Sequence, residues 1–109
     1  MKLFTKANLK SLPTLDESAQ LSIADQKVWV KLFGGSATWY ITSLDPETNE
    51  AFGFVNLGDA QCAELGYIDM NKLTRLKIPP FGLPIERDRH FDPMPLQEVM
   101  DTVKAGGHV

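Results

Sequence analysis

The chain has 109 residues, of which 43% are hydrophobic and 23% charged, so its composition is that of one soluble globular domain. The formal net charge of −3 excludes the broad basic surface that phosphate-driven nucleic-acid binding requires. A single cysteine excludes an intramolecular disulfide and a multi-cysteine zinc site, and no apolar run approaches the ~20 residues of a membrane span. We therefore expect a cytoplasmic protein with no cofactor and no membrane contact.

The first quarter of the chain predicts one short helix and a connection. Thr5 is a suitable N-cap for a helix over 4–12, and the two leucines at its C-terminal end, Leu9 and Leu12, form a thin apolar stripe. The proline at position 13 ends this helix, because the residue before a proline avoids the helical region. The stretch 13–26 has weak periodicity, so we expect a connecting loop with room for one helical turn.

Four runs rich in β-branched and aromatic residues predict strands, at 27–33, 37–44, 51–58 and 65–70. The segment "GGS" at 34–36 supplies residues for a tight hairpin, and "DPETNE" at 45–50 is typical of a turn. Gly53 lies inside the third run, where a glycine indicates a bulge or the close approach of another group.

The second half of the chain predicts two helices around an irregular segment. Asp69 can cap a helix over 70–76 whose two leucines face inward, and 92–107 has the apolar spacing of an amphipathic helix. The segment 77–84 contains three prolines and a glycine, which predicts no regular structure. We expect 85–91 to form a fifth strand, at an edge of the sheet.

Consecutive strands joined by short turns indicate an antiparallel sheet. We expect the helices to pack on one face of it, which gives a single two-layer α+β domain of four to five strands over residues 1–109. Trp39 should share a face with Ile41, opposite Tyr40. The predicted core residues are Val28, Val30, Leu32, Trp39, Ile41, Leu73, Val99 and Met100.

A cluster of ionisable residues before the C-terminal helix is the main candidate site. In an extended strand Glu86, Asp88 and His90 share one face, where they can ligate a divalent cation or act as an acid and a base. The other interpretation is a solvated edge strand in which Arg87 or Arg89 pairs with a carboxylate. We favour this architectural interpretation and expect no metal, because no second histidine stands at ligand spacing.

Arg87 and Arg89, together with Trp39 and Tyr40, are the residues that we expect to contribute to a binding surface. Aromatic rings on a sheet can stack single-stranded bases, but this use normally comes with a basic surround, which this sequence lacks. Aromatic residues at strand spacing also form cores, because each ring buries a large area.

Two further features point away from familiar reaction chemistry. Cys62 lies near Asp59 and Glu64, whose negative charges raise the pKa of a thiol and disfavour a nucleophilic role. The glycine-rich "FGGS" lacks the lysine and the following helix of a phosphate-binding loop, so we expect its glycines to form a tight turn.

Several stretches taken together resemble a known family. They are "KLF" (31–33), "ATWYITSLDPE" (37–47), "AFGFVNLGDAQCAELGYIDM" (51–70) and "GLPIERDRHF" (82–91). The ordered set "TW", "DP", "AFG", "ELGY" and "LPIERD" is similar to that of small bacterial proteins catalogued only as a domain of unknown function, often carried on plasmids and integrative elements. The likeness spans about residues 28–93, and the N-terminal third and the loop 34–36 depart from it.

The resemblance implies a bacterial, cytoplasmic, single-domain accessory of mobile DNA, and it brings no activity and no catalytic residues. We expect a non-enzymatic domain that binds another protein, because an exposed sheet edge can accept a strand from a partner. Two alternatives stay open: a small metal-dependent enzyme or hydrolase using the Glu86, Asp88 and His90 face, and single-stranded nucleic-acid binding through the sheet aromatics, which ranks last.

Overall fold

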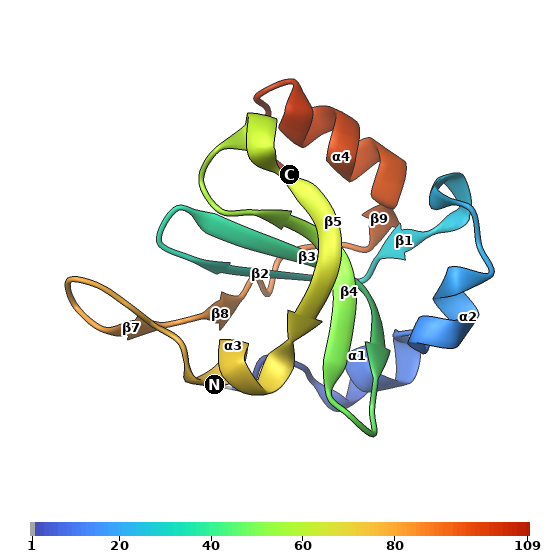
Figure 1. Ribbon diagram of the computed structural model, residues 1–109, viewed down its shortest axis with the longest axis horizontal. Coiled ribbons are helices and arrows are strands. Elements are labelled where there is room, and N and C mark those ends of the chain that lie inside the picture. Colours follow the sequence, from blue (N-terminus) through green and yellow to red (C-terminus); the bar gives the residue numbers. More distant parts are fainter. Residues whose placement is uncertain (1) are drawn as a thin grey trace.

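A five-stranded antiparallel sheet forms the middle of the protein in the computed structural model, which describes residues 2–109 (Figure 1). Its strands in spatial order are β5 (Glu64–Asp69), β4 (Glu50–Asn56), β3 (Ala37–Asp45), β2 (Val30–Gly34) and β8 (Glu86–Arg87). Strands β2 to β5 are neighbours in sequence order, because short connections join antiparallel strands. The predicted α+β class and the predicted hairpins are confirmed.

Two short ribbons and four helices complete the fold. The ribbons pair β1 (Lys27–Val28) with β9 (Met94–Pro95) and β6 (Lys77–Ile78) with β7 (Leu83–Pro84). The helices are α1 (Lys6–Ser11), α2 (Leu15–Ala19), α3 (Met70–Arg75) and α4 (Leu96–Lys104), with single 3-10 turns η1 (Ile23–Asp25) and η2 (Ala60–Cys62). Among the helices of residues 2–109, none is long and apolar enough to span a bilayer.

The ribbon over Lys77–Pro84 corrects the prediction of an irregular segment. Its prolines do not prevent pairing, because a two-residue strand at the periphery needs few backbone donors. The predicted first strand also differs from the structure, since it breaks at Trp29. There the backbone N–H donates to the Ile41 carbonyl oxygen at 2.9 Å, and the chain leaves the β9 ribbon and enters the main sheet.

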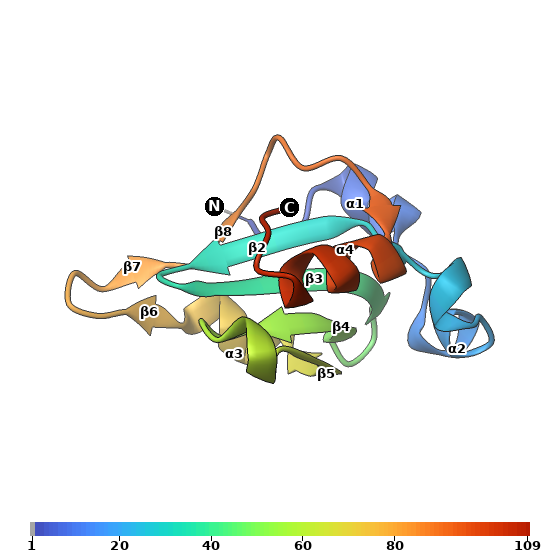
Figure 2. The same cartoon turned by 90° about the horizontal axis from the view of Figure 1, so that it is seen from above.

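Each face of the sheet forms its own core. The first, which we call the α3 core, contains Leu3, Leu12, Val30, Leu32, Trp39, Ile41, Leu44, Ala51, Ile68, Met70, Leu73 and Ile85. The second, the α4 core, contains Val28, Tyr40, Phe54, Ala63, Leu96, Val99 and Val103. Figure 1 shows α4 above the strands of the sheet and α1 and α3 below them, and Figure 2 shows α4 drawn over β3 when the molecule is seen from above. The expectation of helices on one face was therefore wrong: β3 is apolar in both directions, so both faces need cover.

The predicted core residues are buried, except Met100, which is half-buried. Val28 lies in the α4 core rather than beside Val30, because the break at Trp29 interrupts the alternation. Leu9, which belongs to the predicted apolar stripe of the first helix, is exposed, and so is Leu76, which was expected to face inward. Leu76 follows the last residue of α3 with an extended backbone, so it leaves the face that Leu73 buries.

The helix caps follow the sequence closely. Thr5 caps α1 and Asp69 caps α3, as predicted. Thr14 and Glu17 form a reciprocal capping box at α2, a helix that the weak periodicity of 13–26 concealed. The backbone N–H of Thr14 donates to the Glu17 carboxylate and lowers its pKa.

A bulge between β3 and β4 changes which side chains face each core. Ile41 pairs with Gly53 but Ser43 pairs with Phe52, so Thr42 is the extra residue. Regular alternation would place Ser43 on the face of Ile41. The bulge moves it to the opposite face, beside Phe52, while the hydroxyl of Thr42 donates to the Phe52 carbonyl oxygen at 3.0 Å.

Gly53 is required at this bulge, as the sequence indicated. A Cβ atom at position 53 would overlap the carbonyl oxygen of Tyr40, whereas a Cβ at its cross-strand partner Gly66 would meet nothing within 4 Å. We expect Gly53→Ala to lower the free energy of unfolding by about 2–3 kcal/mol, because the backbone must move. Gly66→Ala should leave it unchanged or raise it by about 0.5 kcal/mol. Urea unfolding of both variants tests the register, and equal effects would contradict it.

Candidate functional site

The ionisable cluster after β8 forms a turn rather than an extended strand. The backbone N–H of Asp88 donates to the Lys31 carbonyl oxygen at 2.9 Å, and its carboxylate accepts from the His90 backbone N–H at 2.9 Å. The same carboxylate lies 3.5 Å from Lys31 Nζ. The strand ends at Arg87, so the predicted strand over 85–91 is confirmed only for Glu86 and Arg87.

Glu86, Asp88 and His90 do not form a metal site in this arrangement. Within residues 2–109, no group of three or more His, Cys, Asp or Glu side chains is placed to hold a metal ion. The shared face that we considered for these residues requires an extended backbone through His90. The turn at Asp88 removes it, because that carboxylate already accepts the His90 N–H.

The two arginines of this segment have different environments. Arg87 is half-buried, and its guanidinium donates to the Lys2 carbonyl oxygen at 2.6 Å, which holds the N-terminal segment against the edge of the sheet. Arg89 is exposed. An ion pair of this segment joins Asp88 to Lys31, a partner that the sequence did not identify. The segment thus contributes to the architecture, through partners that the sequence did not identify.

Trp39 and Tyr40 lie inside the protein. Their side chains are only 6% and 4% exposed, in the α3 core and the α4 core respectively, and Trp39 shares its face with Ile41 as predicted. Burial also raises the pKa of the Tyr40 hydroxyl. Neither ring is presented for stacking, which corrects the expectation that these two residues line a binding surface.

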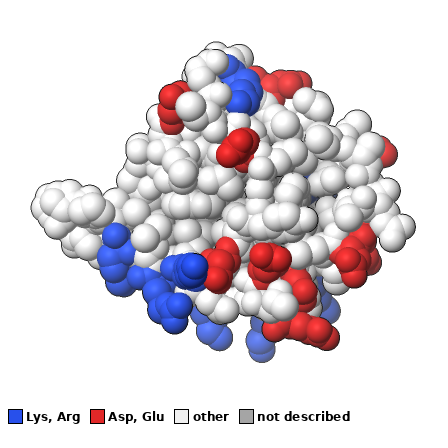
Figure 3. All heavy atoms as spheres, in the orientation of Figure 1, with Lys and Arg blue, Asp and Glu red and all other residues white. Residues whose placement is uncertain are grey.

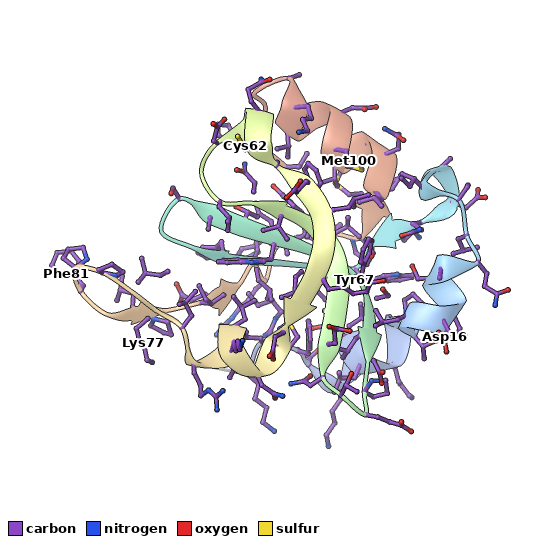
Figure 4. All side chains as sticks on the ribbon, viewed as in Figure 1. Asp16, Cys62, Tyr67, Lys77, Phe81 and Met100 are labelled. Carbon is purple, nitrogen blue, oxygen red and sulfur yellow. The ribbon has the colours of Figure 1, made fainter. Side chains whose placement is uncertain are left out.

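The most exposed large apolar side chains lie instead near β5 and on the β6–β7 ribbon. Tyr67 on β5 is 69% exposed and Leu57 nearby is 70% exposed. Phe81 and Leu83 are exposed on the ribbon, and Figure 4 shows Phe81 at its tip, away from the sheet. The sequence contained one usable signal for Tyr67: the last strand of a meander lies at an edge, so its side chains have neighbours on one side only.

Two hollows adjoin β5 and share Tyr67. The first, which we call the edge groove, has a volume of about 310 Å³ and is lined by Val55, Leu57, Asp59, Cys62, Glu64, Leu65, Gly66 and Tyr67. The second, the α2 pocket, has a volume of about 130 Å³ and is lined by Leu15, Ser18, Ala19, Gln26, Ser43, Phe52 and Tyr67. The edge groove carries two carboxylates, whereas the α2 pocket has no charged residue in its lining.

Cys62 is exposed beside the edge groove, and its environment opposes nucleophilic chemistry. The thiol donates a hydrogen bond to the Asp59 carboxylate at 3.4 Å. This hydrogen bond, and then the negative charge of Asp59, raise the pKa of the thiol. The direction agrees with the expectation from the sequence.

The fold and these surfaces define a small single-domain α+β protein with an open sheet edge between two hollows. The chain matches the family model described as "Protein of unknown function (DUF2958)" over residues 3–109, and it belongs to this family. The match includes the N-terminal third, which the resemblance found in the sequence left out. No curated protein and no solved structure is similar enough to match the chain.

The difference between the two arginines leads to a stability prediction. Arg87→Ala removes the hydrogen bond to the Lys2 carbonyl, and we expect it to lower the free energy of unfolding by about 1–2 kcal/mol. Arg89→Ala is the matched control, since the same substitution at an exposed position should change it by less than about 0.5 kcal/mol. Denaturant melts of the two variants measure the difference, and equal midpoints would show that Arg87 does not stabilise the edge.

The environment of Cys62 leads to a reactivity prediction. The rate of alkylation by iodoacetamide should rise with pH around a midpoint above the ordinary thiol value of ~8.5, because only the thiolate reacts. Asp59→Asn should shift this midpoint downward, since it removes a charge that opposes ionisation. Glu64→Gln is the control and should shift it less, because Glu64 makes the smallest contribution. An unchanged midpoint in Asp59→Asn would refute the assigned cause.

Proposed function

We propose that the protein is a non-enzymatic binding domain that accepts an extended segment of a partner protein along β5. A peptide can add a strand to an open sheet edge, where main-chain hydrogen bonds give affinity and side-chain contacts give specificity. The observation that carries this proposal is the position of β5, a six-residue strand at the end of the sheet order, paired on one side with β4 alone.

The opposite edge of the sheet is less suited to this role. Strand β8 has only two residues, and the turn at Asp88 directs the chain away from the sheet after them. The Lys2 segment also lies against Arg87. A partner strand would find few consecutive backbone groups there, so β5 is the edge that offers a continuous ladder.

Strand β5 also lacks three features with which proteins block an exposed edge, namely lysine, proline and a bulge, and its charged residues stand only at its two ends. Natural edge strands are commonly protected by lysine, proline or a bulge. The segment Glu64–Asp69 contains neither lysine nor proline, and its register with β4 is continuous. Gly66 adds no side chain at the middle of the strand, and its surroundings are open. A second backbone can therefore approach β5 closely.

The charges of β5 indicate the chemistry of the partner. Glu64 and Asp69 stand at its two ends, and Figure 3 shows an uncharged stretch over β5 with acidic groups at both ends. Antiparallel pairing of two copies of β5 in full register would place Glu64 opposite Asp69 at both ends, and like charges directly opposite are destabilising. A segment with an apolar centre, facing Tyr67 and Leu57, and with a basic residue at each end fits better.

The same proposal places the protein in the bacterial cytoplasm, as an accessory of mobile genetic elements. Its support is the ordered set of motifs from "TW" to "LPIERD" that resembles proteins carried on plasmids and integrative elements. The lone exposed thiol of Cys62 fits a reducing compartment.

Selection of 12-residue peptides from a phage-displayed library on the immobilised protein tests the binding proposal. We expect the selected peptides to share an apolar centre between Lys or Arg residues. Glu64→Lys should weaken a selected peptide about tenfold, which corresponds to ~1.4 kcal/mol, because it replaces attraction by repulsion at one end of β5. Fluorescence anisotropy at low and high salt measures the affinity and its charge dependence.

Glu86→Lys is the matched control, because it makes the same charge change at an exposed position on the opposite edge. It should change the affinity by less than about twofold, as a charge beyond a Debye length from the bound peptide is largely screened. Amide hydrogen exchange locates the peptide, since outward N–H groups of β5 become protected when a strand is added. Protection confined to the β6–β7 ribbon, or an affinity that Glu64→Lys does not change, would overturn the proposal.

A further inference from the structure

The α2 pocket contains two buried polar atoms that the fold leaves without partners. Ser43 Oγ and Gln26 Oε1 make no hydrogen bond within residues 2–109, and both belong to residues that line this pocket. Ser43 is fully buried. Buried polar atoms are normally paired, and an unpaired one destabilises the folded state. Two of them at one pocket are therefore a feature that calls for a physical explanation.

Local structure holds both atoms in place. The bulge at Thr42 moves Ser43 onto the face of the sheet that α2 covers. The Gln26 amide is oriented because its Nε2 donates to the Leu21 carbonyl oxygen at 3.3 Å, so the amide oxygen is the atom left buried without a partner. The unpaired groups on the residues that line the pocket are thus one acceptor, Gln26 Oε1, and one hydroxyl, Ser43 Oγ, that can donate or accept.

The walls of the pocket determine what kind of group can enter. No charged residue lines it, so an ion would lose its hydration without gaining a counter-charge. Phe52 and Tyr67 form one aromatic side, with ring centroids 5.1 Å apart at 67°, and Figure 4 shows Tyr67 between β5 and α2. The volume of about 130 Å³ is close to that of an apolar cavity of ~150 Å³ known to admit benzene.

We propose that the α2 pocket is a binding site for an uncharged, planar primary amide. The NH₂ group of such an amide donates to Gln26 Oε1, and its carbonyl oxygen accepts from the Ser43 hydroxyl, so both unpaired atoms are satisfied at once. A flat ring or a short aliphatic stem attached to the amide packs against Phe52 and Tyr67. The amide belongs either to a free small molecule or to an Asn or Gln side chain of a peptide.

This site does not rest on the proposed function of β5. Neighbouring strands lie ~4.8 Å apart, so a strand added to β5 lies three spacings, about 14 Å, from β3, where Ser43 is located. A side chain of the added strand is too short to reach the Ser43 hydroxyl. The two sites share only Tyr67 at their rims, and each can fail without the other.

Titrations followed by ¹H–¹⁵N NMR, with three probes of similar shape, test the inference. Benzamide carries the planar amide, benzoate replaces it by a charge, and toluene has neither. We expect benzamide to shift the backbone amides of residues around the pocket with a millimolar or tighter Kd, and to bind at least tenfold more tightly than benzoate or toluene. Equal binding of benzamide and toluene would contradict the role of the polar atoms. If none of the three probes binds, the pocket holds only water and the proposal fails.

Ser43→Ala separates recognition from folding. Because the Ser43 hydroxyl makes no hydrogen bond within residues 2–109, the variant should keep the Tm of the original chain or raise it, while benzamide binding falls at least fivefold and toluene binding does not. Ser36→Ala, in the exposed hairpin turn, is the matched control and should change neither. If Ser43→Ala lowers the Tm and leaves benzamide binding unchanged, the hydroxyl has a structural role and the proposal fails.

Two further probes distinguish the sources of the amide. Nicotinamide represents a free aromatic amide, and N-acetyl-glutamine methylamide represents a peptide side chain. A tenfold preference for nicotinamide assigns the pocket to a small molecule, and the reverse preference assigns it to a peptide. Loss of either interaction in Gln26→Met, which removes the accepting oxygen and keeps the side-chain length, supports the assigned contact; retention in that variant contradicts it.

Discussion

The close contact between β3 and β4 at Gly53 is the constraint on which the rest of the structure depends. The absence of a side chain at Gly53 lets the backbone of β4 approach the Tyr40 carbonyl, and the strand opposite accommodates Thr42 as an extra residue. Because side chains alternate along a strand, one extra residue exchanges the faces of everything after it. Leu44 consequently joins Trp39 and Ile41 in the α3 core, while Ser43 turns toward α2.

The apolar side chains on both sides of the central strands explain why both faces of the sheet are covered. The central strands present apolar side chains in both directions, so α3 and the N-terminal segment pack on one face and α4 on the other. Because both faces are covered, the two edge strands are the places where backbone groups of the sheet can still pair with another strand. One of them is short and lies against the N-terminal segment through Arg87, and the other is β5. The proposed binding role follows from this division, because β5 combines an unpaired ladder with exposed apolar side chains.

The ionisable residues between Arg87 and His90 show how local geometry decides between chemistry and architecture. A strand would have aligned three potential ligands, but the carboxylate of Asp88 accepts the His90 N–H and lies beside Lys31. This carboxylate stabilises its own turn by accepting a backbone hydrogen bond, as Asp side chains commonly do in turns. The buried side-chain atoms without a partner within residues 2–109 are instead Ser43 Oγ and Gln26 Oε1, which belong to neutral residues that no sequence motif marks.

The sequence by itself determined the α+β class, the order of the main strands, the caps at Thr5 and Asp69, the need for a glycine at position 53 and the burial of Trp39, because each depends on local preference or short-range periodicity. It also determined the direction in which Asp59 shifts the pKa of Cys62, since the two residues are near neighbours in the chain. Only the tertiary structure decided that the first strand breaks at Trp29, that Arg87 bonds to Lys2 and that Ser43 and Gln26 line one pocket. These contacts join residues remote in sequence or depend on the side of a bulge on which the extra residue falls, and neither leaves a periodic signal in a single sequence.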